Sequence, residues 1–441
     1  MLRSKQVIVI GAGITGLTAA FRLMQQGFAV TVIEASEHLG GLAGSLAVGQ
    51  SMVERYYHFI CRGDDDLLSL AEELGLSDQV HWREAKTSFF IKGRTYPFVT
   101  PMDLLRFDPI PSTQRIRLGL HAVFSQHRQN WHGLDRIPAT DWLIRNVGRE
   151  AYLAVWDPLL RIKFGRFQEQ ISAAWIWHRI HRVARSRDGL LKGNTYGYFE
   201  RGCSTLVDAL MDRLTGFPSF RIMRGRTVTS IEVQGSKVVG VKIGSQEELL
   251  PADAVVSTAA IPRFLDIAPD MGEYTARLSD IDYLNVVCML FELDRPFTDS
   301  FWLNINDPAI SFNGIVEITN LSPRPDLGGS SLAYIPFYLH DEDPRWTYPD
   351  LQLYEEYTAA MQRIRKDFDR SWIRNWWVCR DLHAQAICRV GFRDVMPGHE
   401  TPIRGLFITD SSQYYPEDRT VSASIRLGRT VSNVVAEKHA A

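Results

Sequence analysis

The 441-residue sequence predicts an α/β fold in which a Rossmann-type domain is interleaved with an α+β domain and a helical subdomain. Three observations predict it. The first 34 residues contain a strand, a glycine loop, a helix and a second strand in that order. Two further buried-strand patterns, at 252–258 and 405–410, suit the same parallel sheet. In the remaining sequence, residues 101–192 have helical periodicity, and residues 281–380 are rich in strand-like runs.

The N-terminal unit has the element order of a dinucleotide-binding site. Residues 7–10 form a continuous apolar run, as expected of a parallel strand that is buried on both faces. A GxGxxG loop follows, and apolar residues then recur at helical spacing until Gly27. Ala29–Ile33 is the second strand, and Glu34 ends it. A GxGxxG loop between two such strands, followed by an acid, is a strong signal.

Each glycine of this loop has a structural role. Gly11 permits the tight turn, Gly13 lets a pyrophosphate approach the backbone, and Gly16 lets the helix and strand pack closely. The N–H groups at the helix start, including those of Ile14 and Thr15, are free to bind phosphate.

The acid and a second glycine loop complete the predicted nucleotide site. Glu34 accepts a hydrogen bond from a ribose, and its charge disfavours a 2′-phosphate. The loop that follows brings backbone close to a flavin or a pyrophosphate. The residues predicted to bind the cofactor here are Glu34, Ala35, Gly40, Gly41, Leu42 and Ala43.

This second loop resembles the second FAD motif of the superfamily of amine oxidases, phytoene desaturases and protoporphyrinogen oxidases. Many members carry Arg or Lys where this chain has Leu42, which removes one possible phosphate-facing cation. The chain is most similar to the bacterial protoporphyrinogen-oxidase-like branch, on three stretches at 56–59, 158–165 and 415–419.

Two later segments match the same superfamily. In the first strand of the predicted hairpin at 227–243, the resemblance implies that Val228 holds the adenine through its backbone. It also implies that Asp410 binds a ribityl or pyrophosphate-side group. The helix that follows, with Val421 and Ser422 at its start, would point at the flavin N1–C2=O edge. No cysteine stands where some amine oxidases attach the flavin, so we expect non-covalent FAD.

The resemblance gives the predicted domains their roles. The Rossmann-type domain becomes a glutathione-reductase-like FAD-binding domain, and the α+β domain becomes the substrate-binding domain. The predicted boundaries are 1–85, 195–270 and 395–441 for FAD binding, 86–100 and 271–394 for substrate binding, and 101–194 for the helical subdomain.

Candidate substrate residues come from segments that this superfamily turns toward the flavin. His58, Lys163 and His383 are the predicted catalytic residues. Each has a structural alternative, a core histidine or a surface ion pair. The predicted substrate contacts are Tyr56, Tyr57, Arg166, Gln385 and Tyr415. We predict no metal site, and we assign His178 and His181 a structural role.

Composition limits the partners and the compartment. A formal net charge of −2 gives no reason to expect nucleic acid binding. Five widely spaced cysteines indicate reduced thiols and a cytoplasmic protein. Residues 101–193 carry 15 Lys and Arg against 8 Asp and Glu. This basic stretch is interpreted as a solvated face, a site for an acidic substrate or a peripheral membrane patch. The absence of a clear amphipathic helix argues against the membrane patch, and we predict no transmembrane segment.

The leading functional hypothesis is an FAD-dependent oxidoreductase that takes a hydride from a C–H of a small or lipophilic metabolite to flavin N5. A C–C or C–N bond is thereby desaturated, and the reduced flavin passes its electrons to O2 or another carrier. The alternative is a redox-neutral flavoenzyme resembling UDP-galactopyranose mutase, acting on a sugar nucleotide. A third possibility is a binding or scaffold protein that keeps FAD for stability.

Overall fold

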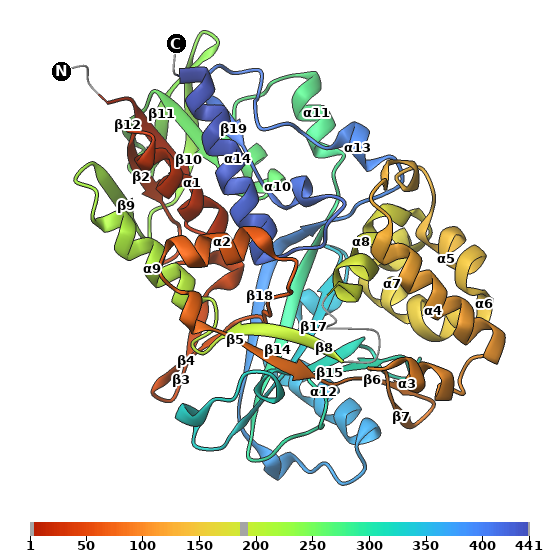
Figure 1. Cartoon of the computed structure of the whole chain (residues 1–441). Helices are drawn as coiled ribbons and strands as arrows, with labels where there is room; N and C mark the ends of the chain where they lie inside the picture. The colour runs from red at the N-terminus through yellow and green to blue at the C-terminus, as the bar shows by residue number, and fades with distance from the viewer. Residues whose placement is uncertain (1–3, 186–192, 440–441) are drawn as a thin grey trace.

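A computed structural model describes residues 4–185 and 193–439, and a five-stranded parallel sheet lies in the upper part of Figure 1. The strand order is β19-β13-β1-β2-β9, and every neighbouring pair is parallel. This sheet brings together segments from both ends of the chain. Its strands are β1 (Gln6–Ile10), β2 (Ala29–Ile33), β9 (Phe220–Met223), β13 (Ala254–Ser257) and β19 (Leu406–Ile408).

Helices α1 (Ile14–Gln25) and α14 (Val421–His439) pack against each other beside this sheet (Figure 1). Their close approach needs Gly428, because a Cβ built there would lie 2.5 Å from the Thr15 carbonyl oxygen. Helices α2 (Asp65–Glu73) and α9 (Ser204–Thr215) complete this layer.

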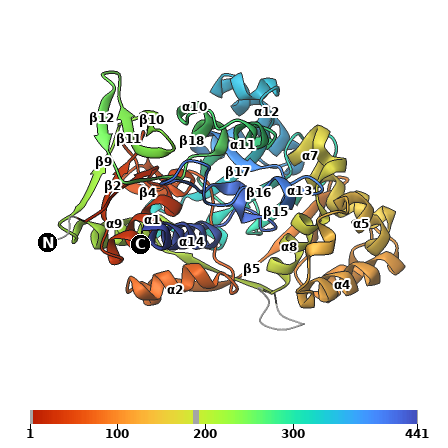
Figure 2. The ribbon, with the colours of Figure 1, turned by 90° about the horizontal axis from the view of Figure 1, so that it is seen from above.

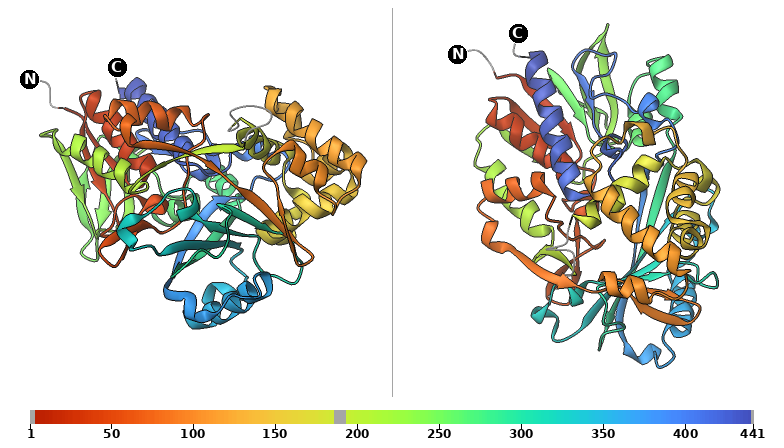
Figure 3. Two further views of the ribbon diagram at one scale, coloured as in Figure 1. Left: turned by 60° about the horizontal axis from the view of Figure 1, so that its bottom comes forward. Right: turned by 45° about the vertical axis from the view of Figure 1, so that its right-hand side comes forward.

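A mixed seven-stranded sheet forms the second layer, in the order β18-β14-β17-β16-β15-β6-β7. All its pairs are antiparallel except β15 with β6. Helix α12 (Asp350–Ile364) lies at the bottom of the left view in Figure 3, below this sheet. The strands are β6 (Thr87–Ile91), β7 (Arg94–Pro97), β14 (Tyr283–Leu293), β15 (Trp302–Ile305), β16 (Gly314–Glu317), β17 (Ser331–Leu339) and β18 (Ile373–Ala386). A parallel sheet with a separate mixed sheet confirms the predicted α/β class.

Three small antiparallel units and several short helices connect the layers. The strands are β3 (Ser45–Val48) with β4 (Ser51–Glu54), β5 (Val80–Ala85) with β8 (Asn194–Phe199), and β10 (Val228–Gln234), β11 (Lys237–Ile243) and β12 (Glu248–Pro251). The connecting helices are α10 (Ile261–Ile267), α11 (Glu273–Ser279) and α13 (Phe392–Val395).

The helical region lies at the opposite end of the molecule from β9–β12 (Figure 2). The predicted helix at 152–160 is divided, because a π-helical turn (Tyr152–Trp156) precedes the next α-helix. Gly165, at φ +49°, ends that helix. The predicted helical stretch at 186–192 lies outside the described residues. The helices are α3 (Pro101–Arg106), α4 (Ser112–His127), α5 (Ala139–Val147), α6 (Arg149–Ala151), α7 (Asp157–Phe164) and α8 (Ala173–Ala184).

Helix α4 has an exposed apolar stripe that its sequence does not make obvious. Ile116, Leu120, Val123 and Phe124 are all exposed, and their spacing places them on one face of the helix. Among the described residues, no helix is both long and apolar enough to cross a membrane.

Candidate active site

An elongated cavity of about 680 Å³ lies where the carboxyl ends of the parallel strands face the seven-stranded sheet. Gly11 follows β1, Glu34 follows β2, Thr258 follows β13 and Asp410 lies just beyond β19, and all four line it. Ligands of open α/β sheets bind at this edge. The two ends of the cavity are built differently, so we describe them separately as the glycine cradle and the charged chamber.

The glycine cradle is formed by the loops at 11–16 and 40–44, which pack backbone against backbone. The Gly40 N–H donates to the Ala12 carbonyl at 2.9 Å. A Cβ at Gly41, where φ is +58°, would lie 3.2 Å from the Gly13 Cα. A Cβ at Gly16 would lie only 2.0 Å from the Gly11 carbonyl oxygen. Side chains at these positions would fill or break the cradle, so its bare backbone is left to face a ligand.

Glu34 fixes one side of the cradle. Its carboxylate accepts hydrogen bonds from the Ala12 N–H at 2.7 Å and the Ser36 N–H at 2.9 Å. Helix α1 begins after Gly13, which offers no capping side chain, so N–H groups of the first turn are left to a ligand. Two glycine loops, an uncapped helix start and a carboxylate fit the ribose and pyrophosphate of a dinucleotide.

Asp410 lies at the cavity edge but is already well bonded. Its carboxylate accepts from the Ser412 hydroxyl and N–H, at 2.5 and 3.0 Å, from the Ile261 N–H at 3.2 Å and from the Tyr283 hydroxyl. Burial raises the pKa of Asp410 above its ordinary value despite these donors. Asp410 therefore holds β19, α10 and β14 together at the cavity wall.

The predicted cofactor residues do not all reach the cavity. Gly11, Gly13, Ile14, Thr15, Glu34, Gly40, Gly41, Leu42, Ala43, Asp410 and Val421 line it. Gly16, Ala35, Val228 and Ser422 lie outside the lining. The Ser422 hydroxyl accepts from the Leu67 N–H at 3.3 Å and so ties α14 to α2.

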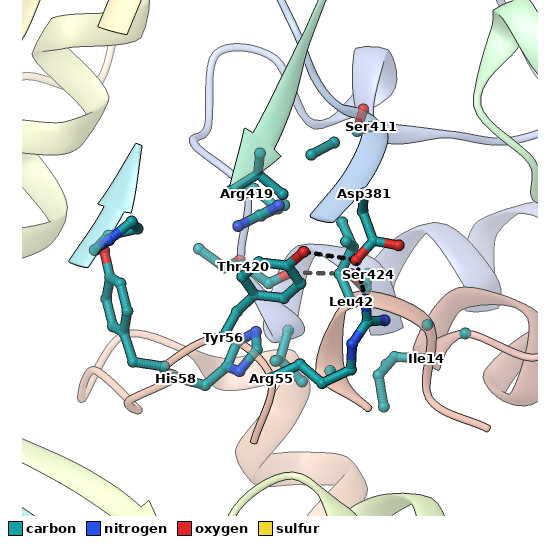
Figure 4. Close-up of a pocket in the computed structure, with 18 of the residues that line it drawn as sticks. Ile14, Leu42, Arg55, Tyr56, His58, Asp381, Ser411, Arg419, Thr420 and Ser424 are labelled. Carbon is teal, nitrogen blue, oxygen red and sulfur yellow. Dashed lines mark hydrogen bonds and ion pairs between the residues drawn. The ribbon is translucent and has the colours of Figure 1, made fainter. Parts of the chain in front are cut away.

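The charged chamber begins at the segment 55–59. Arg55 and Tyr56 converge on the carboxylate of Asp381, at 2.7 and 2.6 Å (Figure 4). Tyr57 contacts Trp302 edge to face, with ring centroids 5.3 Å apart. These side chains give the chamber an aromatic wall with one neutralised ion pair.

His58 is oriented by a buried carboxylate. Its Nδ1 lies 3.1 Å from Glu54 Oε1, which also accepts from the Cys203 N–H at 3.0 Å. Burial alone would raise the pKa of Glu54, but His58 and the Cys203 donor hold it below its usual value. Cys203 stands at the start of α9, where a helix dipole would lower the pKa of a thiol, but burial and the Glu54 charge raise it.

A second charged group lies at the start of α14 and the end of α7. Asp418 pairs with Arg179 at 2.8 Å and with Lys163 at 3.6 Å. The Lys163 side chain is only 4% exposed, and its Nζ lies 4.3 Å from the Tyr338 ring centroid. Burial would raise the pKa of Asp418, but the two cations hold it well below its ordinary value. Arg419 lines the chamber beside this group.

Three predicted substrate residues lie outside the cavity lining. Arg166 is exposed and pairs with Glu342 at 2.6 Å, because Gly165 turns the chain away after α7. The Tyr415 hydroxyl is buried and donates to Asp135 at 2.6 Å. Gln385 reaches the site indirectly, by donating to Asp418 at 2.8 Å.

His383 lies on a bulge of β18 at the chamber wall. Three residues, 382–384, stand opposite Asn285 of β14, and His383 has φ +53°. Its Nδ1 is buried with no hydrogen-bond partner in the described parts of the chain. Burial lowers the pKa of this imidazole, which favours the neutral form at pH 7.

Several residues that line the chamber or lie behind it have no signal in the sequence that assigns them to a site. Glu54, Arg179 and Asp381 lie in ordinary strand or helix patterns. The Arg55–Asp381 pair spans 326 residues of sequence, and the Arg179–Asp418 pair spans 239. Only the tertiary fold brings such partners together.

The sequence matches known proteins over most of its length. The profile of the family described as flavin containing amine oxidoreductase matches residues 14–435. A zeta-carotene desaturase from Synechocystis sp. is 23% identical over 338 residues, which cover 69% of this chain and 67% of that protein. A mitochondrial protoporphyrinogen oxidase from Nicotiana tabacum is 25% identical over 173 residues, which cover 38% of this chain and 34% of that protein.

Solved structures with low sequence identity share the fold. A protein from Exiguobacterium sp. 255-15, provisionally assigned as a protoporphyrinogen oxidase, aligns over 99% of this chain and all of its own, with a TM-score of 0.75 and 15% identity. A reduced UDP-galactopyranose mutase aligns over 98% of this chain and 96% of its own, with a TM-score of 0.74 and 17% identity. Enzymes with different reactions therefore share this architecture, and the fold alone does not choose between them.

Proposed function

The chain belongs to the flavin-containing amine oxidoreductase family, and from that premise we propose that it desaturates a C–C or C–N bond of a small or lipophilic metabolite. It is an FAD-dependent oxidoreductase. One observation carries the proposal: the glycine cradle and the charged chamber are two ends of one cavity.

The cradle residues would hold FAD without a covalent bond. Glu34 would accept from the ribose, the backbone at Gly13 and Gly41 would face the pyrophosphate, and the start of α14 at Val421 would face the flavin. All five cysteines are buried, and none is among the described residues that line the cavity. When bound, FAD supplies the acceptor for the hydride.

The chamber residues would orient the substrate and take the proton that leaves with the hydride. Aromatic side chains at Tyr56, Tyr57 and Trp302 suit an apolar substrate body. The Glu54 carboxylate accepts from His58 Nδ1–H, so His58 Nε2 is left as a proton acceptor. We assign this proton transfer to His58 and a positioning role to Glu54.

Anaerobic mixing of the holoprotein with candidate substrates tests the proposal. Loss of the oxidised flavin absorbance on mixing, with a desaturated product, supports it, whereas failure of every C–H donor to reduce the flavin contradicts it. The rate at which air reoxidises the reduced flavin, compared with the rate for added electron carriers, then identifies the electron acceptor.

A redox-neutral reaction on a sugar nucleotide is the second candidate. The cations Lys163, Arg179 and Arg419 around Asp418 favour it, since they suit a diphosphate. Turnover that occurs only after dithionite reduction, without net oxidation of substrate, would support this reaction.

A further inference from the structure

We propose that Arg419 binds a carboxylate of the substrate, so that the oxidised metabolite is an aromatic or apolar carboxylic acid rather than an amine. This inference rests on the proposed function and specifies its substrate class. Arg419 lies immediately before α14, and Figure 4 shows it above Tyr56 in the cavity.

The Arg419 guanidinium lacks a full set of partners. Its Nη1 is buried and has no hydrogen-bond partner within residues 4–185 and 193–439. Its Nη2 donates only weakly, to the Tyr338 hydroxyl at 3.3 Å. An unpaired buried donor on a cation costs more free energy than a neutral one. A ligand anion would satisfy this group.

Nearby carboxylates are already engaged by other donors. Asp418 accepts from Arg179 and Gln385, both at 2.8 Å, and from the Arg419 backbone N–H at 2.9 Å, and Lys163 lies 3.6 Å away. Three cations therefore surround a single carboxylate, which leaves a local surplus of positive charge.

The second acid of the chamber is neutralised as well. Asp381 accepts from Arg55 at 2.7 Å and from the Tyr56 hydroxyl at 2.6 Å. A substrate ammonium would meet this positive surplus and be repelled, whereas a carboxylate would complete the charge balance.

The surroundings of Arg419 specify the rest of the ligand. Its guanidinium lies 5.9 Å from the ring centroids of both Tyr56 and Tyr338. A carboxylate bound there has aromatic surfaces on two sides for its hydrocarbon body. This combination favours an apolar acid over a fully polar anion such as inorganic phosphate.

Titration of the FAD-loaded protein with three ring compounds of similar size tests the assignment. Benzoate, benzamide and benzylamine differ mainly in charge, and binding is followed by the change in the flavin absorbance spectrum. We expect benzoate to bind at least about tenfold more tightly than benzamide, and benzylamine to bind least. Binding of inorganic phosphate as tight as that of benzoate would overturn the choice of a carboxylate.

Variants test whether Arg419 causes the expected preference for benzoate. Arg419→Met should weaken benzoate binding by about ten- to a hundredfold while leaving benzamide unchanged. Arg419→Lys keeps the charge and should give an intermediate value. The matched control is Arg370→Met, an exposed arginine that pairs with Glu355 at 2.6 Å outside the cavity. This control should not change benzoate binding.

Three further outcomes would overturn the proposal. In the first, benzylamine binds the wild-type holoprotein as tightly as benzoate. In the second, Arg419→Met leaves benzoate binding intact but shifts the flavin reduction potential or FAD affinity, which would assign Arg419 to the cofactor. In the third, a C–H donor reduces the flavin while benzoate does not bind, so the oxidoreductase function stands and the anion site fails.

Discussion

The glycine cradle and the charged chamber are parts of one cavity, but backbone forms the first and side chains form the second. The cradle consists of backbone from the two loops at 11–16 and 40–44, and added side chains would fill or break it. The chamber consists of long charged and aromatic side chains from α7, α8, β15, β17, β18 and the segments that follow β4 and precede α14. A backbone site binds one cofactor, whereas a side-chain site can change its ligand by a few substitutions.

The two ends of the cavity also differ in the groups that bind their carboxylates. In the cradle, the Glu34 carboxylate is held by backbone N–H groups at 2.7 and 2.9 Å. In the chamber, carboxylates are held by cations whose sequence positions are more than 200 residues away. Loss of a side chain in the chamber should therefore alter ligand choice, while a change in the cradle should abolish cofactor binding.

The largest effect is expected from Gly13→Ala in the cradle. The new Cβ has only ordinary contacts in the protein, 3.9 Å to the Gly41 Cα and 4.0 Å to the Gly40 carbonyl oxygen, and φ is −70°. The fold should therefore survive while the pyrophosphate is displaced. Loss of about two charge-assisted contacts would weaken FAD binding roughly a hundredfold or more.

The measurement is FAD affinity by titration of the apoprotein, together with its melting temperature. Gly133→Ala is the control, because a Cβ at Gly133 meets no atom within 4 Å. An unchanged FAD affinity in Gly13→Ala would show that the pyrophosphate does not lie against this loop.

Glu34→Ala should have the next largest effect. The substitution removes the ribose acceptor and also the acceptor for the Ala12 and Ser36 N–H groups. FAD binding should weaken by on the order of 1.5–3 kcal/mol, the range for a hydrogen bond to a charged group. Glu72→Ala, an exposed acid on α2, is the matched control. Equal FAD affinities in both variants would show that Glu34 does not bind the ribose.

The sequence predicts the cradle well and the chamber poorly, for a physical reason. The cradle depends on local turns and on one helix start, so nearly every contact joins residues close in sequence. The chamber depends on ion pairs between residues that lie far apart in the sequence. Lys163 and Arg166 show the difference, because Gly165 between them sends Lys163 into the cavity and Arg166 to the surface.

Lys163→Met should have a moderate effect that is confined to the chamber. Asp418 would retain Arg179 at 2.8 Å, so the fold should persist, but the positive surplus near Arg419 would fall. We expect benzoate to bind about tenfold more weakly, with unchanged FAD content and flavin spectrum. Arg166→Met tests the same charge outside the cavity and should leave benzoate binding as it is. A loss of FAD from Lys163→Met would mean that the two ends of the cavity are not independent.

The smallest effect is expected at Cys203, where the chamber meets α9. A helix start alone would lower the pKa of this thiol, but burial and the Glu54 charge raise it well above the ordinary value. Each unit of increase removes a factor of ten of the reactive thiolate.

Native Cys203 should therefore react with iodoacetamide at pH 8 at least about tenfold more slowly than in the urea-unfolded chain, as followed by peptide mass spectrometry. Glu54→Gln separates the two causes, because it removes the negative charge and keeps the burial. Since burial is the larger cause, the rate in this variant should rise but stay below the unfolded rate. Labelling of the native wild-type protein as fast as the unfolded chain would show that neither burial nor the Glu54 charge suppresses this thiol.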